Sequence, residues 1–201
     1  MNCKIIDDKC IICDGVTEIA ERAFENCDDF TEIEFPATVR KIGALAFASC
    51  SKLTKVHIPN SVKEIGAGAF SDCPKLKKID VDFFNPWFKS KSNCCLTKDG
   101  KTLVFGCNNS IIPEGIEKIS SSAFSGCAFE TIEIPEGVLS IGDFAFSYCS
   151  FLKRIRMPES ITEIGNNAFR CCGDLIEVIL PSKLTKIDDD AFIGCYNLIH
   201  K

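Results

Sequence analysis

Apolar residues recur along this chain with a period of about 23 residues. An Ile stands five residues before each repeated Phe, an Ala directly before it and a Cys three residues after it. The unit reads V-x-x-I-G-x-x-A-F-x-x-C-x-x-L-x-x-I-x-I-P, and its Phe positions are Phe24, Phe47, Phe70, Phe124, Phe146, Phe169 and Phe192. One step, from Phe70 to Phe124, lengthens to 54 residues. Seven copies of one short unit indicate a repeat architecture.

One segment of each unit has the alternating pattern of a short β-strand. In Leu53–Pro59 apolar and polar residues alternate until the proline ends the run. A unit of this size cannot bury its own apolar face, so the copies are expected to stack with parallel strands about 4.7–4.9 Å apart. The recurring Ile, Ala, Phe and Cys then form columns of like residues inside the coil.

The repeated I-G-x-x-A-F-x-x-C-x-x-L-x-x-I-x-I-P units resemble the BspA-like branch of the leucine-rich repeat family, and they span nearly the whole chain. The fold class expected is an α/β-type repeat solenoid of about eight coils, shaped as a leucine-rich-repeat horseshoe. A single parallel β-sheet of short strands would line its concave face, with mostly irregular or turn structure on the convex side. The resemblance implies a solenoid used for binding and adhesion, and it carries no catalytic residues.

We expect one solenoid domain over residues 1–201. Residues 1–15 form a cap-like segment, 16–82 hold repeats 1–3, 83–115 an irregular unit with a hairpin, and 116–201 repeats 4–7, the last one incomplete. The final residues, Leu198 to Lys201, show no cap pattern, although terminal repeats need a polar outer face. This uncapped end has three possible explanations: a truncated chain, a homodimer through this end, or an unusual terminus.

The irregular unit contains Asp99-Gly100 between two apolar-alternating runs, which predicts a projecting hairpin. BspA-like proteins are similar here, with an asparagine-proline and a lysine-aspartate-glycine segment. The unit is expected to end on a normal strand ending at 111–115. Its aromatic residues Phe83, Phe84, Trp87 and Phe88 have two interpretations. In the favoured interpretation the segment is a plain insertion and these rings pack over the core. In the other interpretation they form a contact loop.

Composition limits the function classes. The chain is 46% hydrophobic with a formal net charge of −5, which is typical of a folded protein and argues against nucleic-acid binding. No stretch approaches the roughly 20 apolar residues that a membrane-inserted span needs. The first nine residues show no signal-peptide pattern. Localisation therefore stays open between cytoplasmic and, if the chain is a fragment, the cell surface by family resemblance.

The 14 cysteines first suggest a secreted disulfide scaffold. Half of them occupy the repeat column, where Cys acts as a small buried hydrophobe, so we expect reduced, structural thiols there. The off-register cysteines are Cys3, Cys10, Cys13, Cys94, Cys95, Cys107 and Cys171. Cys10-x-x-Cys13 has zinc or redox spacing but lacks a second pair to complete a metal site. A thiol or zinc protein is thus the least favoured alternative, and no metal or cofactor is expected.

Catalysis has little support in the sequence. The only histidines are His57 and His200, and His57 is expected to point outward from a strand. Paired carboxylates such as Glu32 and Glu34 belong to a solvated strand face. With no triad and no phosphate-binding motif, the protein is predicted to be a non-enzyme.

What remains is the outward face of the strands, where successive coils alternate acidic and basic residues. Glu130 with Lys153 and Glu133 with Arg156 are expected to be cross-strand neighbours. Such pairs either keep the sheet soluble or form a recognition surface, and the two apolar residues in this pattern favour a contact site. The candidate partner-binding residues are Glu32, Glu34, Lys55, His57, Lys78, Glu130, Glu133, Lys153, Arg154, Arg156, Ile176, Glu177, Ile179 and Trp87.

The sequence therefore predicts a non-enzymatic protein-binding, adhesion or scaffold module acting through the concave strand face and the projecting hairpin. Its partner would be a protein or a glycan, with no nucleic acid and no membrane insertion. A purely structural spacer within a larger surface protein is the alternative.

Overall fold

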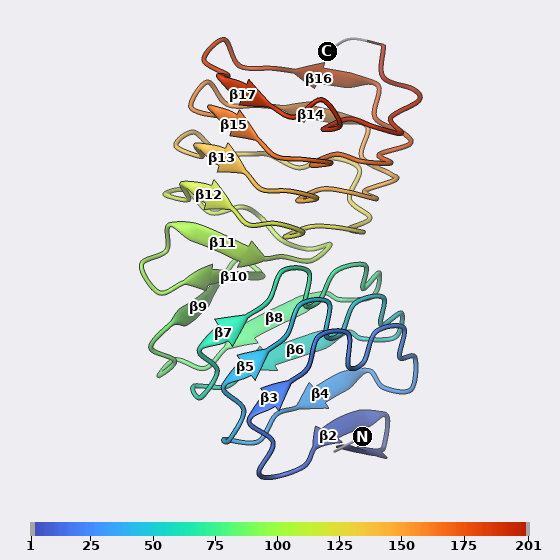
Figure 1. The fold of residues 1–201 in the computed structure, drawn as a ribbon, viewed down its shortest axis with the longest axis vertical. Coiled ribbons are helices and arrows are strands. Elements are labelled where there is room, and N and C mark those ends of the chain that lie inside the picture. The colour runs from blue at the N-terminus through green and yellow to red at the C-terminus, as the bar shows by residue number, and fades with distance from the viewer. Residues whose placement is uncertain (1–2, 200–201) are drawn as a thin grey trace.

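The structure is a computed structural model that describes residues 3–199. The chain winds into a β-solenoid of about eight coils without helices among the described residues (Figure 1). The stacked parallel strands and the repeat architecture expected from the sequence are confirmed. His200 and Lys201, part of the predicted uncapped end, lie outside the described residues.

The first series of strands comes from the L-x-x-I-x-I segments. It comprises β2 (Lys9–Ile12), β4 (Glu32–Glu34), β6 (Lys55–Ile58), β8 (Lys78–Val81), β14 (Arg154–Arg156) and β16 (Glu177–Ile179). We call the outward side of this series the long-strand face. The hairpin partner β1 (Cys3–Ile6) pairs antiparallel with β2 and is the N-terminal edge strand of this sheet.

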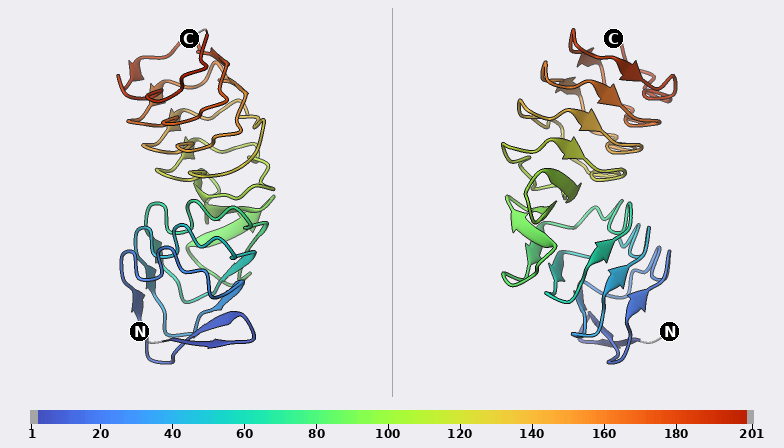
Figure 2. Two further views of the ribbon diagram at one scale, coloured as in Figure 1. Left: turned by 90° about the vertical axis from the view of Figure 1, so that its right-hand side faces the viewer. Right: turned by 60° about the vertical axis from the view of Figure 1, so that its left-hand side comes forward.

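A second series lies on the other side of each coil and comes from the residues before the repeated glycine. It comprises β3 (Glu18–Ile19), β5 (Lys41–Ile42), β7 (Glu64–Ile65), β12 (Lys118–Ile119), β13 (Ser140–Ile141), β15 (Glu163–Ile164) and β17 (Lys186–Ile187). We call its outward side the short-strand face; Figure 2 shows both halves of this series along one side of the molecule. The structure thus has four sheets where the sequence predicts a single one. Two-residue strands are too short to show an alternation in sequence.

The repeated glycine allows adjacent coils to approach closely. A Cβ on Gly66 would collide with the backbone nitrogen of Ala44 and lie 2.7 Å from its Cα. Gly66 donates its N–H to the Ile42 carbonyl at 2.8 Å, which fixes this approach. The glycine is needed here for space, since its φ is not positive.

The core is a column of stacked phenylalanine rings. Phe47 lies between Phe24 and Phe70 with centroid distances of 5.0 and 5.4 Å and nearly parallel planes. The rings of Phe124, Phe146, Phe169 and Phe192 repeat this arrangement at 5.1–5.3 Å. Each coil therefore buries the aromatic face of its neighbour, and stability depends on stacking between units.

The cysteine column has a specific hydrogen-bonding role. Cys50 donates its thiol to the Phe24 carbonyl at 3.2 Å, and Cys149 donates to Phe124 at the same distance. Cys73, Cys172 and Cys195 do the same to the phenylalanine of the preceding coil. The carbonyls of Phe24 and Phe124 also accept the N–H of the cysteine in their own coil, at 3.2 and 3.1 Å, so the thiol of the next coil is a second donor to each. A small side chain with a weak donor fits this position. All 14 cysteines are free thiols in the structure.

The irregular unit is a three-stranded antiparallel meander of β9 (Phe88–Lys91), β10 (Cys94–Thr97) and β11 (Thr102–Phe105). The predicted hairpin at Asp99-Gly100 is present. It joins the short-strand series, because β11 pairs in parallel with β12 (Figure 1). The expected strand ending at 111–115 is wrong: no strand forms there, and Ile111 is 72% exposed.

The meander divides the core into two clusters. On β10, Cys94 and Leu96 pack into the C-terminal cluster and Cys95 packs into the N-terminal one. Phe105 from β11 continues the ring column, with its centroid 4.8 Å from that of Phe70. At the opposite edge the two halves touch directly, since Asp72 donates its N–H to the Ser125 carbonyl at 2.8 Å. The meander therefore separates the two halves of the solenoid along one edge, while the coils on either side of it are hydrogen-bonded directly along the other.

The buried thiols predict a loss of stability in alkali. Burial raises the pKa of the Cys149 thiol from 9.0 to about 12, and it raises the pKa of the Cys94 thiol to the same range. Between these values the unfolded chain releases protons that the folded chain retains, so the free energy of unfolding falls as pH rises. Denaturant titrations at increasing pH should show this fall, and Cys149→Ala should reduce it. A stability that stays flat above the ordinary thiol pKa contradicts the prediction.

Candidate binding surface

The outward positions of the long-strand face form charged rows across the coils. In the N-terminal half, β2, β4, β6 and β8 pair in register, so that Lys9, Glu32, Lys55 and Lys78 follow one another. Lys9 Nζ lies 3.6 Å from Glu34 Oε2. One row further along the strands, His57 Nδ1 lies 2.9 Å from Asp80 Oδ2. His57 is exposed, as the strand pattern predicts.

The C-terminal half of the same face continues the alternation. Lys153 Nζ donates to Glu130 Oε2 at 2.7 Å, which confirms the predicted neighbours. The Lys153 ammonium lowers the pKa of Glu130 through this hydrogen bond and its charge. The bridge between Thr131 and Arg154 has the register on which Glu133 and Arg156 are neighbours, and both line one hollow, but no ion pair joins them within residues 3–199. Arg154 Nε instead lies 3.5 Å from a carboxylate oxygen of Glu177.

Several of the sequence-predicted residues surround one hollow. It measures about 550 Å³ and is lined by Glu133, Arg154, Arg156 and Ile179, together with Glu136 and Glu159. Ile179 is 51% exposed at a position where the equivalent residues of β4, β6, β8 and β14 are charged or polar. Ile176, the other apolar candidate, is partly buried and lies outside this hollow. We call this the C-terminal hollow.

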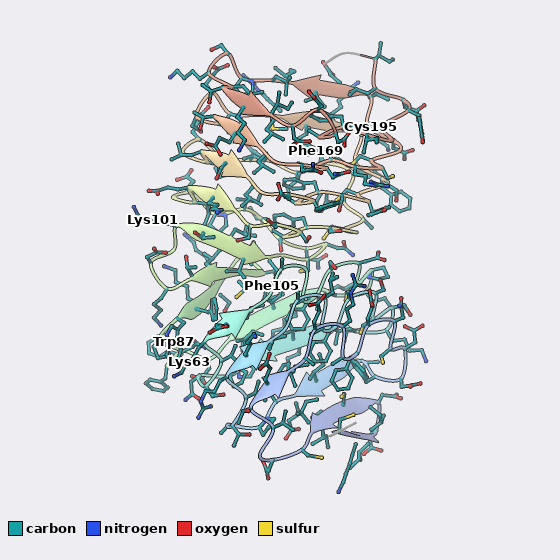
Figure 3. All side chains as sticks on the ribbon, in the orientation of Figure 1. Lys63, Trp87, Lys101, Phe105, Phe169 and Cys195 are labelled. Atoms are coloured by element: carbon teal, nitrogen blue, oxygen red, sulfur yellow. The ribbon has the colours of Figure 1, made fainter. Side chains whose placement is uncertain are left out.

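The aromatic residues of the irregular unit separate into two environments. Phe88 is 7% exposed and packs into the N-terminal core. Phe83 and Phe84 are 85% and 76% exposed, so the expectation that they pack over the core is wrong for this pair. Trp87 is 39% exposed, and the Lys63 ammonium lies 5.2 Å from its ring centroid (Figure 3).

Asn85 explains why these rings stay outside, and sequence reasoning missed it. Its side chain is fully buried and donates to the Pro59 and Val62 carbonyls at 2.8 and 3.1 Å. Its amide oxygen accepts from the N–H groups of Trp87 and Phe88. An asparagine before a proline signals a turn in sequence, but only the structure shows that it anchors the turn to the preceding coil.

The remaining candidates do not gather into a chemical site. Cys10 is buried on β2 next to Cys3, and burial and this neighbour raise its pKa. Cys94 and Cys95 point into different core clusters. Within residues 3–199 no three metal-ligating side chains come together, and that part of the chain holds no helix able to cross a membrane. A further hollow of about 690 Å³ opens beside β7 and the meander, but none of the predicted residues lines it.

Comparisons with known proteins agree with this architecture. The description "BspA type Leucine rich repeat region" matches residues 1–96 and 102–199 in six copies. No curated protein matches the chain. Among solved structures, a leucine-rich cell surface protein from Faecalibacterium prausnitzii is 27% identical with a TM-score of 0.70 over 96% of this chain. The pneumococcal vaccine antigen PcpA is 26% identical with a TM-score of 0.74 over 91%.

A leucine-rich repeat protein of T. pallidum also matches, at 26% identity and a TM-score of 0.51 over 98% of this chain. The chain spans 59% and 53% of the lengths of the Faecalibacterium and pneumococcal proteins, respectively. The repeat unit, the two strand series and the family match lead to one conclusion. This chain belongs to the BspA-type leucine-rich repeat family.

Proposed function

We propose that the chain is a non-enzymatic binding module that engages a protein partner through the long-strand face, with the C-terminal hollow at the centre of the contact. The observation that carries the proposal is Ile179, an exposed isoleucine that lies opposite Arg156 in the β14–β16 pair and lines the C-terminal hollow. Many protein interfaces place an apolar anchor residue inside a polar rim, and the hollow around Ile179 has this arrangement. The cell-surface description of a structural relative supports a binding or adhesion role.

A spacer within a longer surface protein is the second candidate. The chain covers little more than half of two structural relatives. In the last described coil, Ile193 and Tyr196 are 45% and 92% exposed, so another coil or a second copy would find an apolar surface there. A spacer would require no ligand on the long-strand face.

The double variant Ile179→Asp with Arg154→Glu tests the binding proposal. Both side chains are at least half-exposed, so the fold is expected to persist, while the charge reversal and the new carboxylate remove the contact. Quantitative affinity capture from the native setting should recover the partner with the wild-type chain and lose it with the double variant.

The matched control is Glu163→Lys with Lys186→Glu, which changes exposed charges on the short-strand face. It should capture as much partner as the wild type. Equal capture by the long-strand variant would reject this face, and no specific capture by any variant would favour the spacer.

A further inference from the structure

Positive charge is concentrated in one part of this acidic chain. Residues 52–98 contain nine lysines, no arginine and four acidic residues, a formal charge of +5 in a chain whose total is −5. These residues form β6 and β8 of the long-strand series, the turn that holds Phe83 and Phe84, and the start of the meander. An asymmetry of this size points to an anionic partner.

Two of these lysines lie side by side and make no ion pair among the described residues. Lys55 and Lys78 are register partners on β6 and β8, and neither has a carboxylate within ion-pair distance among residues 3–199. Lys9, Lys41, Lys101 and Lys153 each have such a carboxylate. Like charges directly opposite each other destabilise a sheet, and Glu32, the other register partner of Lys55, offsets part of this repulsion. A bound anion would offset the rest.

The aromatic turn next to these lysines is anchored by hydrogen bonds. The Phe84 N–H donates to Asp82 Oδ1 at 2.8 Å, and the Asp82 N–H donates to the Ile58 carbonyl at 2.9 Å. Lys98 Nζ donates to the Asn85 carbonyl at 2.6 Å from the far side. The two exposed rings meet edge to face with centroids 5.3 Å apart. The fold thus presents them to solvent at a fixed place, which lowers the entropy lost on binding.

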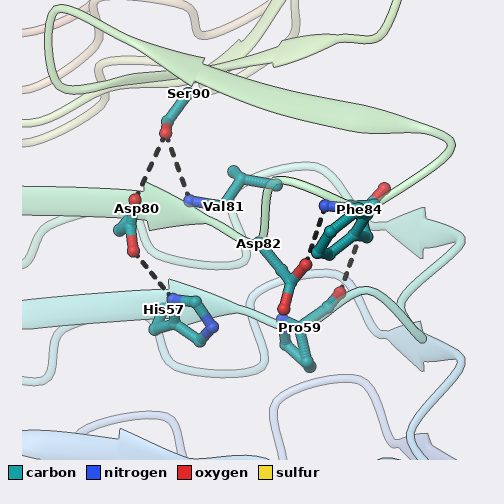
Figure 4. A network of polar contacts seen from close by, with 8 residues as sticks. His57, Pro59, Asp80, Val81, Asp82, Phe84 and Ser90 are labelled. Carbon is teal, nitrogen blue, oxygen red and sulfur yellow. Dashed lines mark hydrogen bonds and ion pairs between the residues drawn. The ribbon is translucent and has the colours of Figure 1, made fainter.

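A hollow of about 940 Å³ lies between the turn and the strands, and we call it the aromatic hollow. His57 and Asp80 line it from β6 and β8, and Ser90 and Lys89 from β9. Ser90 Oγ accepts the Val81 N–H at 3.2 Å and lies 3.5 Å from Asp80 Oδ1 (Figure 4). From Lys78 to Val81, β8 runs for about 10 Å, so the unpaired lysines lie one short strand from the rings.

The exposed rings, the carboxylates and the nearby lysines together fit a ligand that combines sugar rings with negative charge. A sugar ring has an apolar face that stacks on an aromatic ring, and its hydroxyls donate to carboxylates such as Asp80 and Asp82 and to serine. A carboxylate or sulfate on a neighbouring sugar pairs with the lysines. A nucleic acid would bring its phosphates against the two aspartates, and an acidic peptide lacks an apolar ring face between its charges.

We propose that the aromatic hollow and the Lys55–Lys78 pair form a binding site for an acidic oligosaccharide. The site deepens the proposed function, because it assigns a ligand to the same long-strand face. It uses residues distant in sequence from those of the C-terminal hollow. Loss of this site would therefore leave the protein contact intact, and each proposal can fail alone.

Isothermal titration of the full chain with defined probes tests the proposal. The probes are a keratan sulfate oligosaccharide for sulfate and a hyaluronan oligosaccharide for carboxylate, in which acidic and uncharged sugars can alternate, and neutral maltooligosaccharide, polyglutamate and oligothymidylate for comparison. At least one acidic oligosaccharide should bind, and more weakly as salt increases. The acidic oligosaccharide that binds more tightly shows whether the site prefers sulfate or carboxylate. Lys55→Glu with Lys78→Glu and, separately, Phe83→Ser with Phe84→Ser should each weaken binding about tenfold or more, equal to about 1.4 kcal/mol.

The control Lys118→Glu with Lys186→Glu makes the same charge change on the short-strand face and should bind as the wild type does. Thermal unfolding of the two phenylalanine substitutions should match the wild type, because both rings are largely exposed. The proposal is overturned if neither acidic oligosaccharide binds, if polyglutamate or oligothymidylate binds as tightly, or if removal of the two rings leaves the affinity unchanged.

Discussion

Phe146→Ala is expected to lower the free energy of unfolding by about 3–5 kcal/mol. The Phe146 ring is fully buried between Phe124 and Phe169, with centroid distances of 5.3 and 5.2 Å. Its loss leaves a cavity and removes two stacking contacts at once. Because coils interact with their nearest neighbours, the C-terminal half should also unfold less cooperatively. Denaturant titration measures both effects.

Tyr196→Ala is the control for this substitution, since its aromatic ring is 92% exposed. It should change the free energy of unfolding by no more than about 0.5 kcal/mol. A loss below about 1 kcal/mol for Phe146→Ala would mean that the ring column does not join the coils.

Gly66→Ala has the second large expected effect, a destabilisation of about 1–3 kcal/mol or more. The new methyl group would meet the backbone of Ala44, and backbone cannot rotate away as a side chain can. Restoring space would require the two coils to separate, which lengthens the hydrogen bond from Gly66 to the Ile42 carbonyl. Thermal unfolding of the purified variant measures the change.

Gly173→Ala is the matched control, because a Cβ there has no atom within 4 Å and the φ of Gly173 is not positive. It should be neutral or stabilising by up to about 1 kcal/mol, since alanine has less conformational freedom in the unfolded chain. If both substitutions have the same effect, close approach of the coils is not the reason for glycine in the repeat.

The regular part of this fold is predictable because each repeated residue makes the same contact in every coil. The sequence period places Phe47 and Phe146 in equivalent columns, and the structure stacks both. Cys50 and Cys149 are predicted as buried, but their hydrogen bonds to the preceding phenylalanine carbonyl depend on the spacing between coils. Sequence alone does not contain that spacing.

The irregular unit is less predictable because its residues make contacts that occur only once. The Asp99-Gly100 turn is recognisable locally, whereas the pairing of β11 with β12 depends on the stacked repeats around it. Phe105 enters the ring column from a segment that lacks the Ala-Phe pair. The exposure of Phe83 follows from the burial of Asn85, a long-range contact that a pattern of apolar residues does not reveal.

The candidate surface also has a part that the sequence predicts and a part that it does not. Strand alternation places His57, Arg154 and Ile179 on the outward face, and the structure agrees. Arg154 makes its ion pair with Glu177, and no ion pair joins Glu133 to Arg156 among the described residues. Which of these contacts forms depends on side-chain conformations across coils. Register alone predicts neighbours but not which pairs make contact.

Site-specific photo-crosslinking tests most directly whether binding takes place on the long-strand face. A photoreactive amino acid replaces Ile179 in one variant and Glu163 in another, so the two probes occupy exposed positions on opposite faces of adjoining coils. Irradiation in the native setting should give a discrete covalent adduct from position 179 and none from position 163. Adducts from position 163 alone, or equal adducts from both positions, would contradict the account.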